Sequence, residues 1–278
     1  AQWNDDFHNA LHVLLTGESE GYYELYADDP AARLARVLGE GFAFQGEPDH
    51  HGKMRGEPSG FLPPSKFVVF AQNHVQVGNR AIGDRLSTVV SPQQLRLSAA
   101  VVVLSPFLPM LFMGEEYGET APFQYFTSHS DRDLIEAVRK GRREEFDDFE
   151  WKGEPPDPHD EQTFRRSTLD WSLVKQEKHA SLRDLYRKLF TARRERPALR
   201  SLDLDSVETH ADDATRVLLV HRRAENDRAL IAFNFSESAQ TIGIPFAAAQ
   251  WKVVIDTGAS VRGERLELQP FSFGLFGL

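Results

Sequence analysis

The pattern of apolar residues changes near residue 200, and this change constrains the fold more than any other feature of the sequence. Before it, short apolar runs alternate with helical segments, which is the signature of βαβ units and a parallel sheet. After it come short β-rich runs separated by turn residues, namely "TRVLLVHRR", "RALIAFNFS", "AQTIGIPF", "WKVVIDTG" and "LELQPFSFGLF". This regular spacing indicates a small antiparallel β-domain. We therefore predict an α/β region over residues 1–200, followed by an antiparallel β-sandwich domain over residues 201–278.

The composition is that of a soluble globular protein, and it argues against several classes of function. Of the 278 residues, 41% are hydrophobic and 27% are charged, and the formal net charge is -10. That charge argues against nucleic-acid binding, which needs clustered Lys and Arg. No apolar run is long enough to cross a bilayer, so we expect no membrane partner. The chain has no cysteine, hence no disulfide and no thiolate metal site, which fits a cytoplasmic location.

Local signals place the first elements. Asp5 or Asp6 is expected to cap a helix that ends at Gly17. Ser91 and Gln94 form a predicted capping box at the start of a second, buried helix.

The remaining segments are less regular. Residues 45–65 are rich in Gly, Pro and charge and are predicted to form a long loop. Residues 118–179 are an aromatic and acidic insertion of low periodicity. A clear amphipathic helix follows and ends near Pro197, with Leu182, Leu185, Leu189 and Phe190 on its apolar face.

Polar side chains follow three strand-like runs within the first 200 residues. The clearest case is "KFVVFAQNHVQVGNRAIGDRL", residues 66–86, in which four apolar residues lead directly into amides, an imidazole and a guanidinium. In parallel α/β folds, reactive groups gather where the strands end. Amides, imidazole and aromatic faces suit a neutral, hydroxyl-rich ligand such as a sugar. The candidate ligand-binding residues are Trp3, Asn4, Asp5, His8, Asn73, His74, Gln76, Arg80, Glu115 and Glu116.

Each of these residues also has a structural interpretation. An Asn-His pair after a strand can be a turn, Asp5 can be a helix cap, and Glu115 with Glu116 can complement a helix dipole. The "DHH" run at 49–51 is a weak metal candidate because it lacks helical or strand spacing. No glycine-rich phosphate loop, G-x-S-x-G elbow or nucleophilic Cys is present. We predict no metal and no cofactor.

The segment "FAQNHVQVGNRAIGDRL" resembles the fourth signature region of the α-amylase family of glycoside hydrolases, at the end of barrel strand seven. More narrowly, "AQWNDDFHNALHVLLTGESEGYY", "LPMLFMGEEYGETAPFQYFTSHSD", "VRKGRREEF" and "FRRSTLDWS" resemble the malto-oligosyltrehalose trehalohydrolase branch. Members of that branch release trehalose by cutting the α-1,4 bond next to it. The resemblance implies the C-terminal part of a TIM barrel, about strands six to eight, followed by the β-domain. It also implies a malto-oligosaccharide substrate, with His74 as a sugar-binding residue.

The resemblance also exposes two departures from the family pattern. The family has "QNHDQ" where this chain has "QNHVQ", so Val75 stands at the position of the Asp that stabilises the transition state. Relative to the family, barrel strands one to five are expected to be absent, and with them the nucleophilic Asp and the general-acid Glu. The isolated chain is therefore expected to be inactive. The sequence leaves open whether the missing N-terminal half is a separate partner chain. It also leaves open another α-amylase-family activity, such as that of a branching enzyme, and a non-catalytic sugar-binding remnant.

Overall fold

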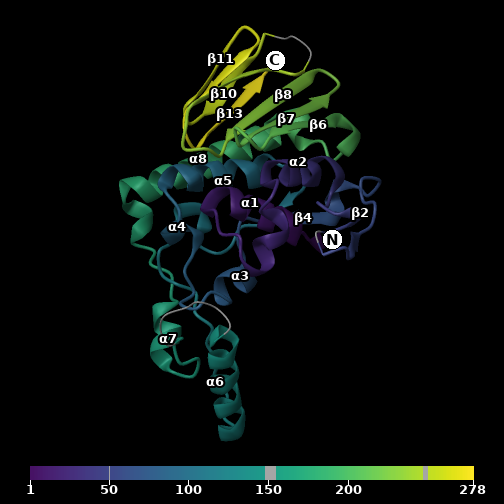
Figure 1. Ribbon diagram of the computed structural model, residues 1–278. Helices are drawn as coiled ribbons and strands as arrows, with labels where there is room; N and C mark the ends of the chain where they lie inside the picture. The colour runs from purple at the N-terminus through teal and green to yellow at the C-terminus, as the bar shows by residue number, and fades with distance from the viewer. Residues whose placement is uncertain (50, 148–154, 247–249) are drawn as a thin grey trace. The chain divides into compact units, whose positions relative to one another are not determined.

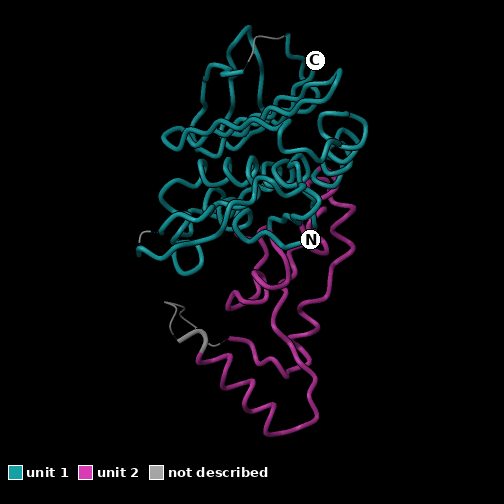
Figure 2. The backbone as a smooth tube through the Cα atoms, turned by 90° about the vertical axis from the view of Figure 1, so that its right-hand side faces the viewer, with its two compact units in different colours: residues 1–71, 90–110, 182–278 teal, residues 72–89, 111–181 magenta. Residues whose placement is uncertain are grey.

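The computed structural model describes residues 1–49, 51–147, 155–246 and 250–278. These residues form two compact units that are interleaved along the chain (Figure 2). Unit 1 comprises residues 1–71, 90–110 and 182–278, and unit 2 comprises residues 72–89 and 111–181. Among the described residues, no helix is long and apolar enough to span a bilayer.

A three-stranded parallel sheet lies at the start of unit 1. It has the order β1-β4-β5, formed by β1 (Gln2–Trp3), β4 (Phe67–Val69) and β5 (Leu108–Pro109). The register pairs Trp3 with Val68 and Val69 with Pro109. The prediction of three strands in parallel is confirmed. The strands are shorter than predicted, however, and β5 covers only two residues of its apolar run.

Helix α1 (Asp5–Thr16) follows β1 directly, and its cap corrects the prediction. The N-cap is Asn4, whose Oδ1 accepts a hydrogen bond from the Phe7 N–H at 3.1 Å. Asp6, one of the two predicted caps, instead accepts a hydrogen bond from the Ala43 N–H at 2.8 Å. The helix ends as predicted at Gly17, whose φ of 75° lies in the left-handed region that glycine tolerates best.

The other predicted helices of unit 1 are present. Helix α5 (Pro92–Leu104) begins with the predicted capping box of Ser91 and Gln94. Helix α8 (Glu177–Glu195), which belongs to unit 1 from Leu182 onward, buries three of its four predicted apolar residues. The fourth, Phe190, is 37% exposed, so its assignment to the buried face was wrong. The remaining helical segments of this unit are η1 (Gly21–Tyr26), α2 (Pro30–Glu40), η2 (Pro64–Lys66), α9 (Pro197–Arg200) and η5 (Leu204–Ser206).

The predicted loop over residues 45–65 contains a small hairpin. Strands β2 (Gln45–Pro48) and β3 (Met54–Gly56) pair antiparallel, so the prediction of a loop was wrong over these residues. Gly56 has a φ of 68°, and a Cβ on it would lie 2.0 Å from the Phe44 carbonyl oxygen. Only glycine fits this close backbone approach.

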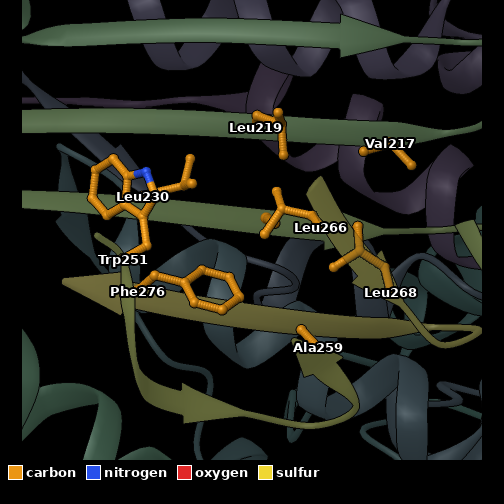
Figure 3. Close-up of a cluster of buried hydrophobic side chains, with 9 residues drawn as sticks. Val217, Leu219, Leu230, Trp251, Ala259, Leu266, Leu268 and Phe276 are labelled. Carbon is orange, nitrogen blue, oxygen red and sulfur yellow. The ribbon is translucent and has the colours of Figure 1, made fainter. Parts of the chain in front are cut away.

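Two antiparallel sheets form the C-terminal part of unit 1, as predicted (Figure 1). A five-stranded sheet has the order β10-β13-β8-β7-β6, and a three-stranded sheet has the order β11-β12-β9. Apolar side chains from both sheets form one buried cluster, most of which Figure 3 labels. The strands are β6 (Val207–Asp212), β7 (Val217–Ala224), β8 (Asp227–Asn234), β9 (Gln240–Gly243), β10 (Lys252–Asp256), β11 (Ala259–Arg262), β12 (Arg265–Leu268) and β13 (Ser272–Gly277).

The five-stranded sheet is also covered on its other face. Alternate residues of β7 and β8, such as Leu218, Val220 and Phe233, are buried although they lie outside the cluster between the sheets. Helix α2 contacts β6 and β7, and helix α5 contacts β8 and β13 (Figure 1). The sheet therefore shares a core with helices from the first 110 residues. The predicted domain boundary at residue 200 stays a prediction.

Two arginines, of which Arg222 is buried, attach this sheet and α8 to the C-terminal end of α5. Arg222 on β7 is fully buried and donates to the carbonyls of Leu104 at 3.0 Å and Ser105 at 3.1 Å. Arg193 on α8 donates to the carbonyl of Val103 at 2.7 Å. The last carbonyls of a helix have no partner within it and carry partial negative charge, so they suit cationic donors.

Unit 2 is made mainly of helices and irregular segments. Its regular elements are α3 (His74–Gly78), α4 (Leu86–Val89), η3 (Glu115–Tyr117), α6 (Arg132–Asp147), α7 (Glu161–Arg166) and η4 (Leu173–Lys175). The described part of the insertion predicted over residues 118–179 therefore contains α6 and α7, which its weak periodicity did not indicate.

Candidate functional site

Four of the predicted ligand-binding residues, Trp3, Asn4, Asp5 and His8, lie in unit 1 where β1 passes into α1. Asn4 is fully buried, and both ends of its amide are used within the fold. Its Oδ1 caps α1, and its Nδ2 donates to the Gly41 carbonyl at 2.7 Å. Asn4 therefore ties α1 to the turn at Gly41 and has no surface to offer a ligand.

His8 is also buried, and its hydrogen bonds fix its protonation. Nδ1 lies 2.8 Å from the Ala71 carbonyl oxygen, and Nε2 lies 3.2 Å from the Tyr23 hydroxyl. A carbonyl can only accept, so Nδ1 carries the hydrogen and Nε2 accepts from Tyr23. Burial, reinforced by the neighbouring His12 and opposed by the Ala71 hydrogen bond, lowers the pKa of His8 to about 3. This neutral ring joins α1 to Ala71, two residues beyond the end of β4.

Trp3 and Asp5 face solvent. The Trp3 ring is 41% exposed and packs edge-on against Phe70, with ring centroids 5.9 Å apart. Partial burial raises the pKa of Asp5 above its ordinary value, and the charge of Asp6 adds to the rise. Of the four predicted residues in unit 1, these two have surface that a ligand can reach.

In unit 2, the segment after β4 forms the short helix α3, and two of its predicted ligand-binding residues are caps. Asn73 Oδ1 accepts from the Val75 N–H at 2.7 Å, while Gln76 Oε1 accepts from the Asn73 N–H at 3.0 Å. This reciprocal arrangement is a capping box. It leaves His74 and Val75 exposed, with Val75 at 45%. Val75 thus presents its isopropyl group to solvent.

The other charged residues predicted for the site also lie in unit 2. Arg80 follows α3, and Glu115 and Glu116 lie in η3. Arg80 Nε donates to Asp84 Oδ2 at 2.8 Å. Glu115 is largely buried and accepts from the Phe112 N–H at 3.2 Å, whereas Glu116 is half-buried. Both glutamates belong to η3, which is flanked by the left-handed residues Gly114 and Gly118, with φ of 85° and 69°.

Sequence reasoning missed two buried charged residues, Arg85 and Glu119, which are each 1% exposed. Glu119 Oε1 accepts from the N–H groups of Thr120 and Ala121, both at 2.8 Å. Its Oε2 accepts from the Tyr117 hydroxyl at 2.9 Å and the Asp170 N–H at 2.7 Å. Burial, strengthened by this contact with Glu119, raises the pKa of Tyr117 well above its usual range.

Arg85 reaches the same stretch of chain. Its Nε donates to the Ala121 carbonyl at 2.6 Å, and its Nη1 donates to the Met113 carbonyl at 2.8 Å. Burial lowers the pKa of Arg85, and the negative charge of Glu119 is the strongest influence opposing that shift. Neither residue belongs to a periodic pattern. The sequence offers one weak signal of their burial: Arg85 directly precedes Leu86 in "GDRL", and Glu119 directly follows Gly118 in "YGET".

Among the residues that the structure describes, no group of three or more His, Asp or Glu side chains is arranged to hold a metal ion. His50, in the weak metal candidate at 49–51, lies outside the described residues. The expectation that no metal or cofactor is needed stays a prediction.

Comparison with known proteins relates the whole chain to one group of enzymes. A protein-family model described as a domain of unknown function, DUF3459, matches residues 204–275. A malto-oligosyltrehalose trehalohydrolase from Rhizobium sp. (strain M-11) is 40% identical over 275 residues, which is 98% of this chain and 45% of that protein. The corresponding protein of Arthrobacter ramosus is 43% identical over 228 residues, or 80% of this chain and 38% of that protein. The chain thus spans less than half the length of these relatives.

Solved structures give the same picture at the level of the fold. The crystal structure of a candidate α-amylase from Salmonella typhimurium is 38% identical, with a TM-score of 0.88, and the match covers 100% of this chain and 46% of that one. The catalytic module of the glycogen-degrading pneumococcal virulence factor SpuA matches with a TM-score of 0.64 at 15% identity, covering 100% of this chain and 43% of that one. At that identity the likeness concerns the fold alone.

Proposed function

We propose that this chain, a homologue of malto-oligosyltrehalose trehalohydrolases over 98% of its length, supplies glucan-binding residues of such a glycosidase and does not break glycosidic bonds by itself. The observation that carries the proposal is the 40% identity that extends along 275 residues, from the first strand into the C-terminal sheets. The names of these relatives support the proposed substrate class, a malto-oligosaccharide or malto-oligosyltrehalose.

Under this proposal, β1, β4 and β5 correspond to strands six to eight of a (β/α) barrel. Two features support the assignment: the strands are parallel and adjacent in the order β1-β4-β5, and polar segments follow them. In such barrels, ligand-binding residues lie at the C-terminal ends of the strands. The solved structure of the pullulanase SAP, which matches this chain with a TM-score of 0.61, contains maltotetraose.

The predicted residues whose side chains keep some exposed surface are the proposed sugar contacts. In unit 1 these are Trp3, whose exposed ring offers a face to glucose C–H groups, and Asp5. In unit 2 they are His74, Arg80 and Glu116, with the mostly buried Glu115 shaping their surroundings. The other four predicted residues do not contact the sugar in this proposal. Their side chains hydrogen-bond to the backbone and hold in place the segments that carry the sugar contacts; these residues are Asn4, His8, Asn73 and Gln76.

The proposed lack of hydrolysis follows from the carboxylates. A retaining glycosidase needs a nucleophile and an acid about 5 Å apart across the scissile bond. No acidic residue of this chain matches the family's pair, and Val75 replaces the third carboxylate. Removing one electrostatic group of that kind typically costs about 10²-fold or more in rate. A polypeptide that carries the family's nucleophile and acid is the proposed partner.

One further reading is favoured by a specific observation: a non-catalytic sugar-binding module, which the exposed Val75 would suit. Incubation of the chain with malto-oligosyltrehalose, with free trehalose measured by chromatography and binding measured by titration calorimetry, tests the binding and the inactivity that both readings predict. We expect binding without trehalose release. Trehalose release by the wild-type chain would refute the proposed inactivity. A folded chain that binds neither malto-oligosyltrehalose nor maltoheptaose would refute the proposed binding function.

A further inference from the structure

The two stretches of chain that make up unit 2, residues 72–89 and 111–181, are joined by several hydrogen bonds that involve residues 83–87. Residues 72–89 carry His74 and Arg80, and residues 111–121 carry Glu115 and Glu116. Apart from η3, the second of these stretches has no helix or strand of its own. Its conformation must therefore be held by contacts with other segments.

Arg85 supplies the central contacts. Its Nε and Nη1 donate in two directions, to the carbonyls of Ala121 at 2.6 Å and Met113 at 2.8 Å, which lie on either side of η3. Its guanidinium also lies over the Phe112 ring, 4.7 Å from the centroid. A planar fork that bonds in two directions and stacks on a ring is specific to arginine, because the lysine ammonium is a single point charge.

Neighbouring residues reinforce the same junction. The Ser87 hydroxyl donates to the Glu119 carbonyl, and the Phe123 N–H donates to the Gly83 carbonyl at 2.7 Å. Within the second stretch, the Glu115 N–H donates to Phe112 at 2.9 Å, and the Glu119 N–H donates to Gly114 at 2.9 Å. These turn bonds close a tight loop around η3, and Arg85 fixes both ends of it.

We propose that Arg85 is a positioning residue, which holds the loop of residues 111–121 so that Glu115 and Glu116 are preorganised for a glucan. Arg85 itself is too buried to touch the sugar. Preorganised groups bind more tightly because less conformational freedom is lost on binding. The part of this inference that concerns glucan affinity rests on the proposed function, whereas the part that concerns the loop does not.

The test compares Arg85→Lys with the matched control Arg222→Lys in the full chain. Arg222 is another fully buried arginine that donates only to backbone carbonyls, but it lies in unit 1. Backbone hydrogen exchange of Glu115, Gly118 and Glu119 reports on the loop, and titration calorimetry with maltoheptaose reports on affinity. In Arg85→Lys we expect exchange about tenfold faster and affinity about tenfold weaker, the factor that corresponds to one lost hydrogen bond to a charged group. In Arg222→Lys we expect neither change.

The outcomes separate the two proposals. Two results for Arg85→Lys would overturn the positioning role. One is faster hydrogen exchange of the loop with unchanged maltoheptaose affinity, and the other is hydrogen exchange of the loop equal to that of the wild type. If the wild-type chain itself does not bind maltoheptaose, the proposed function fails, while the exchange measurement still decides whether Arg85 holds the loop. If Arg85→Lys does not fold, Ser87→Ala takes its place. We expect the same effects at smaller size, and exchange equal to the wild type would overturn the proposal.

Discussion

Replacement of Glu119 by Gln tests how strongly one buried carboxylate holds unit 2 together. The substitution preserves shape but converts one oxygen into an NH₂ group. Each carboxylate oxygen of Glu119 accepts two hydrogen bonds. Whichever oxygen becomes the NH₂ group therefore faces two groups that donated to it in the wild type. The less damaging orientation points it toward Tyr117, whose hydroxyl can rotate and accept. The Asp170 N–H, which cannot rotate, then loses its acceptor.

The magnitude follows from these contacts. A buried N–H without a partner costs about 1–3 kcal/mol. The remaining hydrogen bonds lose their charge assistance, which roughly halves their strength. Loss of the carboxylate also removes the strongest negative influence on the buried Arg85 guanidinium. From the unpartnered N–H and the weakened hydrogen bonds together, we expect Glu119→Gln to lower the free energy of unfolding by about 2–4 kcal/mol in total.

Urea unfolding followed by circular dichroism measures this loss. The exposed Glu161, which pairs with Arg165 on the surface of α7, provides the control. Glu161→Gln should change the free energy of unfolding by less than about 0.5 kcal/mol. A loss of under about 1 kcal/mol in Glu119→Gln would refute the reasoning, because it would mean that a single N–H bond accounts for the whole contribution of the carboxylate.

Three further predictions concern unit 1. Arg222→Met should lower the free energy of unfolding by about 2–5 kcal/mol, because the carbonyls of Leu104 and Ser201 lose their buried donor; denaturant curves matching the wild type would contradict this. The pKa of His8 falls from 6.5 to about 3 on folding, so the unfolded chain binds more protons between these values. Stability should therefore fall as the pH drops below about 6.5, and the slope should be shallower in His8→Gln; equal slopes would exclude this role. Residues 201–278 expressed alone should aggregate or fail to give a cooperative transition, because the sheet face that carries Leu218 would be exposed; a monodisperse, cooperatively folding fragment would support the predicted boundary instead.

Sequence patterns predicted the elements whose burial is periodic. The capping box at Ser91, the end of α1 at Gly17 and the antiparallel strands after residue 200 all have local signals that tertiary contacts did not override. The cap of α1 was ambiguous because Asn4, Asp5 and Asp6 can all accept at a helix start. The choice of Asn4 depends on Gly41, which lies far along the chain and accepts from the Asn4 amide.

The site could be predicted only in part, for a related reason. His74, Arg80 and Glu116 were selected because polar groups after apolar strands have a recognisable pattern, and their role as sugar contacts stays a prediction. Arg85 and Glu119 were missed because a buried charge is stabilised by specific partners, here Met113, Ala121 and Tyr117, and no periodicity indicates those partners. Composition alone places Arg and Glu on the surface.

The proposed function requires His74 and Glu116 of unit 2 to contact a glucan. A crystal structure of the chain soaked with maltoheptaose tests this requirement. We predict a glucose residue within hydrogen-bonding distance of His74 and Glu116, with its glycosidic bonds intact. Well-ordered maltoheptaose bound elsewhere while both side chains face only solvent would contradict the account.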